Sequence, residues 1–223
     1  MFGLSKRQLL SLSIPKTIYF NYRYFGLHGL FSFNVLCSRY VKFRSLKGNV
    51  ELDGKLTTGC VKIGFQEVSV FDNKFERTIW ENYGDIIIAP GFFLGSGSRI
   101  SNHGSMMFGE NFHVSAKSTF ICNKKIFFGK DVLVSWECLF MDTDFHQIMD
   151  NKTDRCINED RDIYISDRVW FGCKCIVLKG SEILRDTVIA AGSIVSGGGG
   201  KQTVHSCVIA DGEVIKSDVS WIR

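Results

Sequence analysis

The sequence has few prolines and no long apolar stretch. Its 223 residues include two prolines, and no apolar run approaches the roughly 18 residues that a membrane-spanning helix requires. The short run from Leu9 to Ile14 ends at Pro15, and no small-residue cleavage site follows it, so we expect no secretory signal. With 45% hydrophobic and 22% charged residues, the composition is that of a folded chain and excludes disorder as its main state.

A disulfide framework is also lacking. The eight cysteines show no regular spacing, and a chain of this length does not need covalent cross-links, which favours reduced thiols in the cytoplasm. Cys173 and Cys175 lie two apart, but a structural zinc site needs a second pair of ligands and none is near. We therefore expect the cysteines to serve core packing, and we expect no metal to be required.

Acidic residues are missing from the first fifty positions. That segment holds eight Lys or Arg and sums to +8, whereas the remaining residues, with 19 basic and 23 acidic, sum to −4. It also has ten of the 29 aromatic residues, among them Tyr19, Phe20 and Tyr22. Two interpretations follow, a helical cap packed on the domain or a surface that meets an anionic membrane, and the two are compatible.

Large apolar residues recur at intervals of six in the middle of the chain. They form three triplets that start twenty residues apart, at Ile88, Leu94, Ile100, Phe108, Val114, Phe120, Phe128, Val134 and Phe140. After a break the interval of six returns, at Ile165, Phe171, Val177, Ile183, Ile189 and Val195. A helix with about 3.6 residues per turn cannot keep such positions on one face, whereas a short strand followed by a corner can.

Three units of six residues make one triangular coil of 18 residues. Stacked coils would place Phe108 over Ile88 and Phe128 over Phe108, about 4.8 Å apart as in any hydrogen-bonded sheet. The two additional residues in each coil between 88 and 128 would be absorbed at one corner. The sequence therefore predicts an all-β fold, a parallel β-helix.

Parts of the sequence resemble the hexapeptide-repeat acyltransferases. The most specific stretches are MDTDFHQI at 141–148, VWFGCKCIVLKGS at 169–181 and VIAAGSIVS at 188–196, and they are similar to maltose and galactoside acetyltransferases and to O-acetyltransferases of capsule or lipopolysaccharide sugars. The resemblance implies a left-handed β-helix and a homotrimer. It also implies that acetyl-CoA donates an acetyl group to a sugar hydroxyl of a surface polysaccharide.

We expect this fold to be divided into three segments. An N-terminal cap covers 1–45, the β-helix covers 46–200 with an extruded loop at 142–163, and a C-terminal tail covers 201–223. The expected location is the cytoplasm, with the inner face of the membrane as the alternative that the basic segment raises.

The loop that interrupts the repeat between Phe140 and Ile165 is the expected place of the chemistry, because long loops on a regular scaffold usually carry function. If its first residues are extended, Asp142, Asp144 and His146 share one face. A hydroxyl attacks a thioester slowly unless a base takes its proton, and histidine suits that role at neutral pH. In the family the matching histidine is the general base, which makes His146 the candidate base. The two aspartates either orient its ring or only shape the loop.

The resemblance also indicates residues for acetyl-CoA. Trp170 matches a tryptophan that lies near the catalytic histidine in relatives. Cys173, Ala191 and Ser196 match positions at which small side chains let the pantetheine arm lie along the coils. Packing at tight corners is the alternative explanation for each of these residues.

Two lysines and a further histidine complete the candidates. Lys201 and Lys216 are candidates for the phosphates of coenzyme A, with solvated surface charge as the alternative, and the glycines before Lys201 depart from the family pattern. His113, on a coil beside the base of the loop, is a candidate for binding the acceptor. Its spacing from His103 does not fit the zinc ligands of related β-helix enzymes, so we expect no metal there.

Two other functions compete with O-acetyl transfer. One is N-acetylation of an amino sugar nucleotide, in which an unprotonated amine needs less help from a base. The other is a non-catalytic β-helix scaffold, which would bind no coenzyme A.

Overall fold

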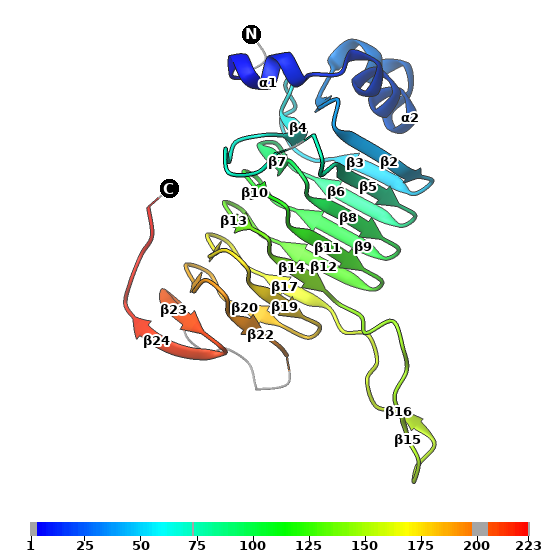
Figure 1. Ribbon diagram of the computed structural model, residues 1–223. Helices are drawn as coiled ribbons and strands as arrows, with labels where there is room; N and C mark the ends of the chain where they lie inside the picture. The colour runs from blue at the N-terminus through cyan, green and yellow to red at the C-terminus, as the bar shows by residue number, and fades with distance from the viewer. Residues whose placement is uncertain (1–3, 73, 198–204, 223) are drawn as a thin grey trace.

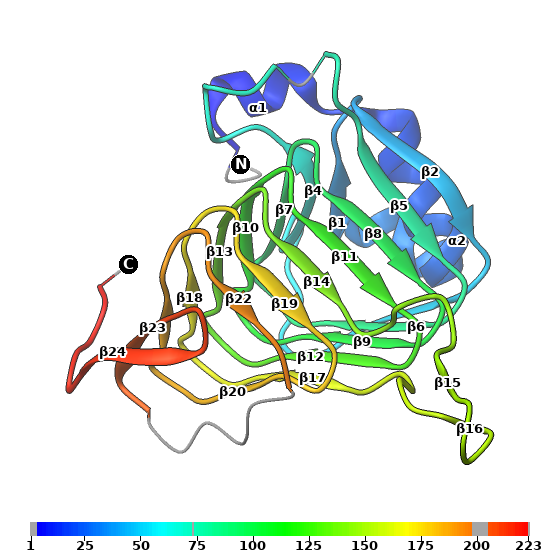
Figure 2. The same ribbon diagram turned by 60° about the horizontal axis from the view of Figure 1, so that its bottom comes forward.

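The interval of six residues corresponds to short strands that fall in turn on three sheets (Figure 1). In the computed structural model, which describes residues 4–72, 74–197 and 205–222, these sheets form the sides of a triangular prism (Figure 2). Seen from the C-terminal end, the chain runs clockwise as it comes toward the viewer, so the coil is left-handed (Figure 2). The predicted left-handed parallel β-helix is confirmed.

Successive coils pair in parallel within each sheet. The first sheet has the order β1 (Val35–Cys37), β4 (Val61–Phe65), β7 (Phe92–Gly95), β10 (His113–Ala116), β13 (Leu133–Trp136), β18 (Trp170–Phe171), β21 (Val188–Ile189), β23 (Cys207–Ala210) and β24 (Glu213–Ser217), of which the last two are antiparallel. The second has the order β2 (Val41–Leu46), β5 (Thr78–Asn82), β8 (Arg99–Asn102), β11 (Thr119–Cys122), β14 (Leu139–Met141), β19 (Ile176–Leu178) and β22 (Ile194–Val195). The third has the order β3 (Asn49–Leu52), β6 (Asp85–Ile88), β9 (Ser105–Phe108), β12 (Lys125–Phe128), β17 (Ile163–Ile165) and β20 (Glu182–Ile183).

Inward side chains stack in columns, as predicted. Ile88 pairs with Phe108, and Phe108 pairs with Phe128. The rings of Phe108 and Phe128 are stacked, with centroids 5.4 Å apart and planes inclined by 6°. Beyond the loop Ile165 pairs with Ile183, so the later coils have the 18-residue length. The core is therefore a continuous apolar column inside the prism.

The two additional residues of the longer coils lie at the corner between the second and third sheets, as predicted. Through the intervening coil, Ile121 is in register with Leu178 before this corner and Ile126 with Ser181 after it. Four residues separate these positions in the longer coil and two in the later coil. Because side chains of a strand alternate with a period of two, an insertion of two residues keeps every inward residue inward.

Two helices cover the N-terminal end of the prism (Figure 1). They are α1 (Lys6–Ser11) and α2 (Ile14–Ser32), and α2 buries Thr17, Phe20 and Asn21 against the first coil. The amide Nδ2 of Asn21 donates to the carbonyl of Val35 at 2.7 Å, which ties the helix to β1. Neither helix in the described part of the chain has the length and apolarity to cross a membrane. The division at residue 45 stays a prediction, and β1 and β2, which lie before it or across it, already belong to the sheets.

Loss of one ring from the core column should be costly. Phe128→Ala should lower the free energy of unfolding by about 3–5 kcal/mol, because the ring is fully buried between Phe108 and Phe140 and its removal leaves a cavity. Urea denaturation measures this change. Phe75→Ala is the matched control, because that ring is 86% exposed and its loss should change stability by less than about 0.5 kcal/mol. Equal losses in the two variants would contradict the stacked core.

Candidate active site

The loop that interrupts the repeat leaves the prism at the corner between the second and third sheets. The chain leaves β14 at Met141 and returns at Ile163 in β17 (Figure 1). Between them an antiparallel pair, β15 (Met149–Asp150) and β16 (Arg155–Cys156), projects away from the coils. The candidate base and both candidate aspartates lie on the first, outgoing part of this loop.

Asp142 anchors the loop to the preceding coil. Its carboxylate is fully buried and accepts hydrogen bonds from the backbone N–H groups of Asn123 at 2.8 Å, Lys124 at 2.9 Å and Lys125 at 2.8 Å. Both oxygens are therefore engaged by the backbone. The structure does not bring this carboxylate to the imidazole of His146, and it supports the loop-shaping alternative for Asp142.

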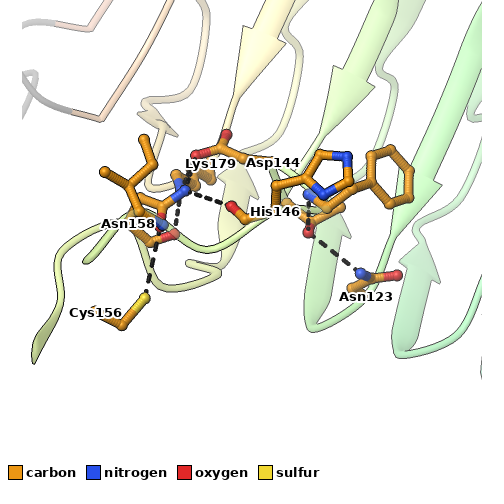
Figure 3. Close-up of polar contacts among 9 residues, drawn as sticks. Asn123, Asp144, His146, Cys156, Asn158 and Lys179 are labelled. Carbon is orange, nitrogen blue, oxygen red and sulfur yellow. Dashed lines mark hydrogen bonds and ion pairs between the residues drawn. The ribbon is translucent and has the colours of Figure 1, made fainter.

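Asp144 is held by two residues that the sequence patterns did not identify. Its Oδ2 accepts from Nδ2 of Asn158 at 2.8 Å and pairs with Nζ of Lys179 at 2.5 Å (Figure 3). The Lys179 side chain is only 11% exposed, and its Nζ also donates to the carbonyl of Asn158 at 2.5 Å. Lys179 and then Asn158 lower the pKa of Asp144 by stabilising its charged form. The lowered pKa therefore favours the ionised form of Asp144, which pairs with Lys179.

His146 is fixed through its backbone while its ring is exposed. The amide Nδ2 of Asn158 donates to the carbonyl of His146 at 2.8 Å, and Oδ1 of Asn158 accepts from the N–H of Ile148 at 2.6 Å (Figure 3). No side chain in the described ranges hydrogen-bonds to the imidazole. Asn158 thus holds the first turn of the loop, and the ring nitrogens remain available to a bound molecule.

The imidazole lines a polar cleft of about 310 Å³ at the base of the loop. Asn123 and Thr143 line the same cleft, and the Asn123 amide donates to Oγ1 of Thr143 at 3.2 Å. Phe145 has a φ of 62°, a left-handed conformation that bulky side chains rarely adopt, and its N–H donates to Thr143 Oγ1 at 3.1 Å. Amide, hydroxyl and imidazole groups around one cleft suit a ligand that carries several hydroxyls.

Three of the residues expected to contact acetyl-CoA lie toward the opposite edge of the second sheet. Cys173 and Ala191 are neighbours at the corner between the first and second sheets, where the N–H of Gly192 donates to the carbonyl of Cys173 at 2.8 Å. Trp170, in β18 just before this corner, donates from Nε1 to Oγ of Ser135 at 3.3 Å. Within one chain the structure therefore groups these residues with each other and not with His146.

The remaining candidates are spread over the surface. Ser196 is exposed after β22 at the loop side of the second sheet, Lys216 is exposed on β24, and Lys201 lies outside the described residues. His113, on β10, contacts Oε2 of Glu67 through Nε2 at 2.7 Å and lines a separate cleft of about 390 Å³. The roles expected for these residues stay predictions.

Comparison with known proteins tests the resemblance. No protein-family model matches the chain. Over 109 residues the chain is 28% identical to the galactoside O-acetyltransferase of Lactococcus lactis subsp. lactis, a match that covers 49% of this chain and 50% of that protein. The resemblance to galactoside acetyltransferases is confirmed. Because the chain spans about half the length of the relative that it matches, activity and substrate come to it only as proposals.

Three solved structures of acyltransferases are similar to the chain. The polysialic acid specific acetyltransferase NeuO is 18% identical, with a TM-score of 0.49 and coverage of 85% of this chain and 78% of that chain. The polysialic acid O-acetyltransferase OatWY is 20% identical, with a TM-score of 0.48 and coverage of 82% and 70%. The N-acyltransferase AntD of Bacillus cereus, crystallised with dTDP and coenzyme A, is 15% identical with a TM-score of 0.38. Similarity at this level carries no information about the reaction of this chain.

The two aspartates should respond differently to removal. Asp142→Ala should lower the free energy of unfolding by about 2–4 kcal/mol, because three N–H groups lose a buried charged acceptor. Asp144→Ala should cost only about 0–1 kcal/mol, because the Asp144 side chain is 40% exposed and Lys179 keeps its hydrogen bond to the carbonyl of Asn158. Urea denaturation of both variants measures the difference. A loss for Asp144→Ala as large as that for Asp142→Ala would contradict this assignment of anchor and ion pair.

Proposed function

We propose that the protein is an acetyl-CoA-dependent O-acetyltransferase that modifies a sugar hydroxyl of a surface polysaccharide or of its precursor. The observation that carries the proposal is the exposed imidazole of His146 in a polar cleft, on a loop whose sequence resembles that of known acetyltransferases. Support also comes from the similarity to a galactoside O-acetyltransferase, whose name states that it acetylates a sugar.

The proposed reaction is a direct transfer with His146 as general base. An imidazole nitrogen takes the proton of the sugar hydroxyl while the hydroxyl oxygen forms a bond to the thioester carbon. The resulting tetrahedral intermediate collapses by breaking the carbon–sulfur bond. The sulfur of coenzyme A leaves with the proton that the imidazole returns, so the products are an acetyl ester and a free thiol. Asn158 and Lys179 contribute by holding the loop in place.

Acetyl-CoA is proposed to lie along the later coils. The corner with Cys173 and Ala191 offers small side chains beside Trp170, which suits an extended pantetheine arm. Ser196 lies at the other end of the paired strands β19 and β22. Lys216 and Lys201 are the proposed partners of the phosphates. His113 is proposed to bind the acceptor at the separate cleft of about 390 Å³ that it lines.

The proposed homotrimer would complete the site. Because His146 and the Cys173–Ala191 corner lie at different edges of the second sheet, one prism does not present them to the same molecule. Two prisms side by side can bring the loop of one copy to the corner of the next. The proposed location is the cytoplasm, at the inner face of the membrane.

Removal of the base tests the reaction. His146→Ala should reduce acetyl transfer by about 10²–10⁴-fold, because the hydroxyl loses its proton acceptor. The melting temperature should stay nearly unchanged, since the ring makes no hydrogen bond to the described side chains. His28→Ala is the matched control, an exposed histidine of α2 at the N-terminal end of the prism, and should retain full activity. Release of free coenzyme A thiol, measured with galactosides and sialic acid polymers as acceptors, reports the rate. A His146→Ala enzyme that transfers at the normal rate would overturn the assignment of the base, and efficient transfer only to amines would favour N-acetylation.

A mixed oligomer tests whether two copies share a site. Ala191→Trp should strongly raise the KM for acetyl-CoA, because the indole would occupy the exposed corner on which the pantetheine arm is proposed to lie. Ala191→Trp and His146→Ala chains should each be inactive alone and regain activity when they are co-expressed. In a mixed trimer one interface combines an intact His146 with an intact corner. Absence of recovery in a proven mixed oligomer would place the complete site within one copy.

A further inference from the structure

The outer surface of the N-terminal cap exposes many large apolar side chains. While α2 buries Thr17 and Phe20 against the first coil, Ile14 and Ile18, four residues apart on the same helix, are exposed. Leu10 of α1 is 75% exposed and Phe31 near the end of α2 is 86% exposed. The large exposed apolar side chains of the two helices are Leu9, Leu10, Ile14, Ile18, Tyr19, Tyr22, Leu27 and Phe31. Single exposed apolar residues are normal on a protein surface, but a concentration of this kind marks an interaction site.

The same end of the prism carries uncompensated positive charge. All eight basic residues of the first fifty positions lie in the two helices, in the first coil or between them, and that segment has no acidic residue. In the described part of the chain none of the eight forms an ion pair, and seven of them are exposed. The eighth, Lys16, is partly buried, and its Nζ donates to the carbonyls of Arg39 and Val41 at 2.6 and 2.5 Å.

A cationic cleft opens beside this apolar surface. It has a volume of about 290 Å³ and is lined by Arg7, Arg39 and Lys74, with Leu10 at its side. No acidic side chain of the described residues lines it. Guanidinium and ammonium groups that converge without a carboxylate are suited to a phosphate group, which guanidinium can bind in a bidentate manner.

We propose that this end of the prism docks on a membrane of anionic phospholipids, with the exposed apolar side chains in the interfacial region and lipid phosphates in the Arg7–Arg39–Lys74 cleft. Apolar and basic side chains on one surface are the features of proteins that lie in the plane of an anionic bilayer. A second copy of the chain is a poorer occupant. Two caps face to face would each bring a segment of charge +8 without a single acidic residue.

Docking through this end would set the position of the proposed active site. In the second sheet, β14 follows β2, β5, β8 and β11, so about four spacings of ~4.8 Å separate the start of the loop from the first coil. The loop would then stand about 20 Å beyond the first coil, on the side away from the bilayer. This consequence rests on the proposed function, and it favours an acceptor glycan that is linked to a membrane lipid.

Vesicle sedimentation of the full chain tests the docking surface. The vesicles contain phosphatidylcholine alone or phosphatidylcholine with phosphatidylglycerol, each at low and high salt. One variant removes apolar contacts, Leu10→Gln with Ile18→Gln and Phe31→Gln, and a second removes cleft charges, Arg7→Gln with Lys74→Gln. The matched control, Lys130→Gln with Arg185→Gln, removes the same charge from exposed positions at the corner between the third and first sheets of later coils.

The original chain should bind the phosphatidylglycerol vesicles at low salt, and roughly tenfold or more weakly at high salt or without the anionic lipid. Both cap variants should lose about tenfold or more of this binding, and the control should lose little. Equal loss in the control would overturn the specific surface, and absence of vesicle binding would overturn the proposal. A self-association that the apolar variant abolishes would instead assign the surface to contacts between copies. Binding of soluble glycerophosphoglycerol to the cleft without vesicle binding would assign the cleft to free phosphates.

Acetyl transfer to a soluble acceptor, measured on the same variants, separates this proposal from the proposed function. None of the substituted residues belongs to the proposed active site, so transfer should be unchanged in all of them. Loss of vesicle binding with intact transfer supports the docking surface. A chain that never binds vesicles yet transfers acetyl overturns the docking surface alone, whereas a chain that binds vesicles and transfers nothing overturns the proposed function alone.

Discussion

Parallel pairing of successive coils in one register determines which side chains of this protein face inward. The pairing of Ile88 with Phe108 and of Phe108 with Phe128 stacks inward residues directly over one another. A slip of one residue would turn every inward side chain outward, so the apolar column and the hydrogen-bonded register support each other. The loop does not disturb this arrangement, because Phe128 pairs with Ile165 across the interruption. The scaffold can therefore carry a long excursion without loss of core.

The loop itself owes its position to polar contacts. Asp142 is bound by backbone amides of the preceding coil, and Asn158 bonds to Asp144, His146 and Ile148 from the returning part of the loop. Lys179, which belongs to the next coil, joins the loop to the prism through Asp144. These contacts leave the imidazole of His146 exposed on a fixed backbone. An imidazole with this exposure and this anchoring suits the proposed general base, whose hydrogen-bonding partner would be supplied by a substrate.

The period of six was sufficient to predict the β-helix and its columns, because burial dictates the residue type at every inward position. The spacing of eight residues from Ile100 to Phe108 also indicated a wider corner in the longer coils, and the strand register places the two additional residues at such a corner. Alternation placed Asp142, Asp144 and His146 on one face, but Asp142 is still part of the corner and turns to the backbone. Asn158 and Lys179 were missed because they lie 14 and 35 residues from Asp144 and meet it only through the fold of the loop.

A crystal structure of the protein with coenzyme A and a sugar acceptor bound would test most directly whether His146 of one copy meets a thioester held along the corner of a neighbouring copy. We expect that the pantetheine arm passes Cys173 and Ala191 and that the sulfur and a sugar hydroxyl both lie within reach of one His146 ring. Coenzyme A bound on a different side of the prism, with no substrate atom near that ring, would contradict this expectation.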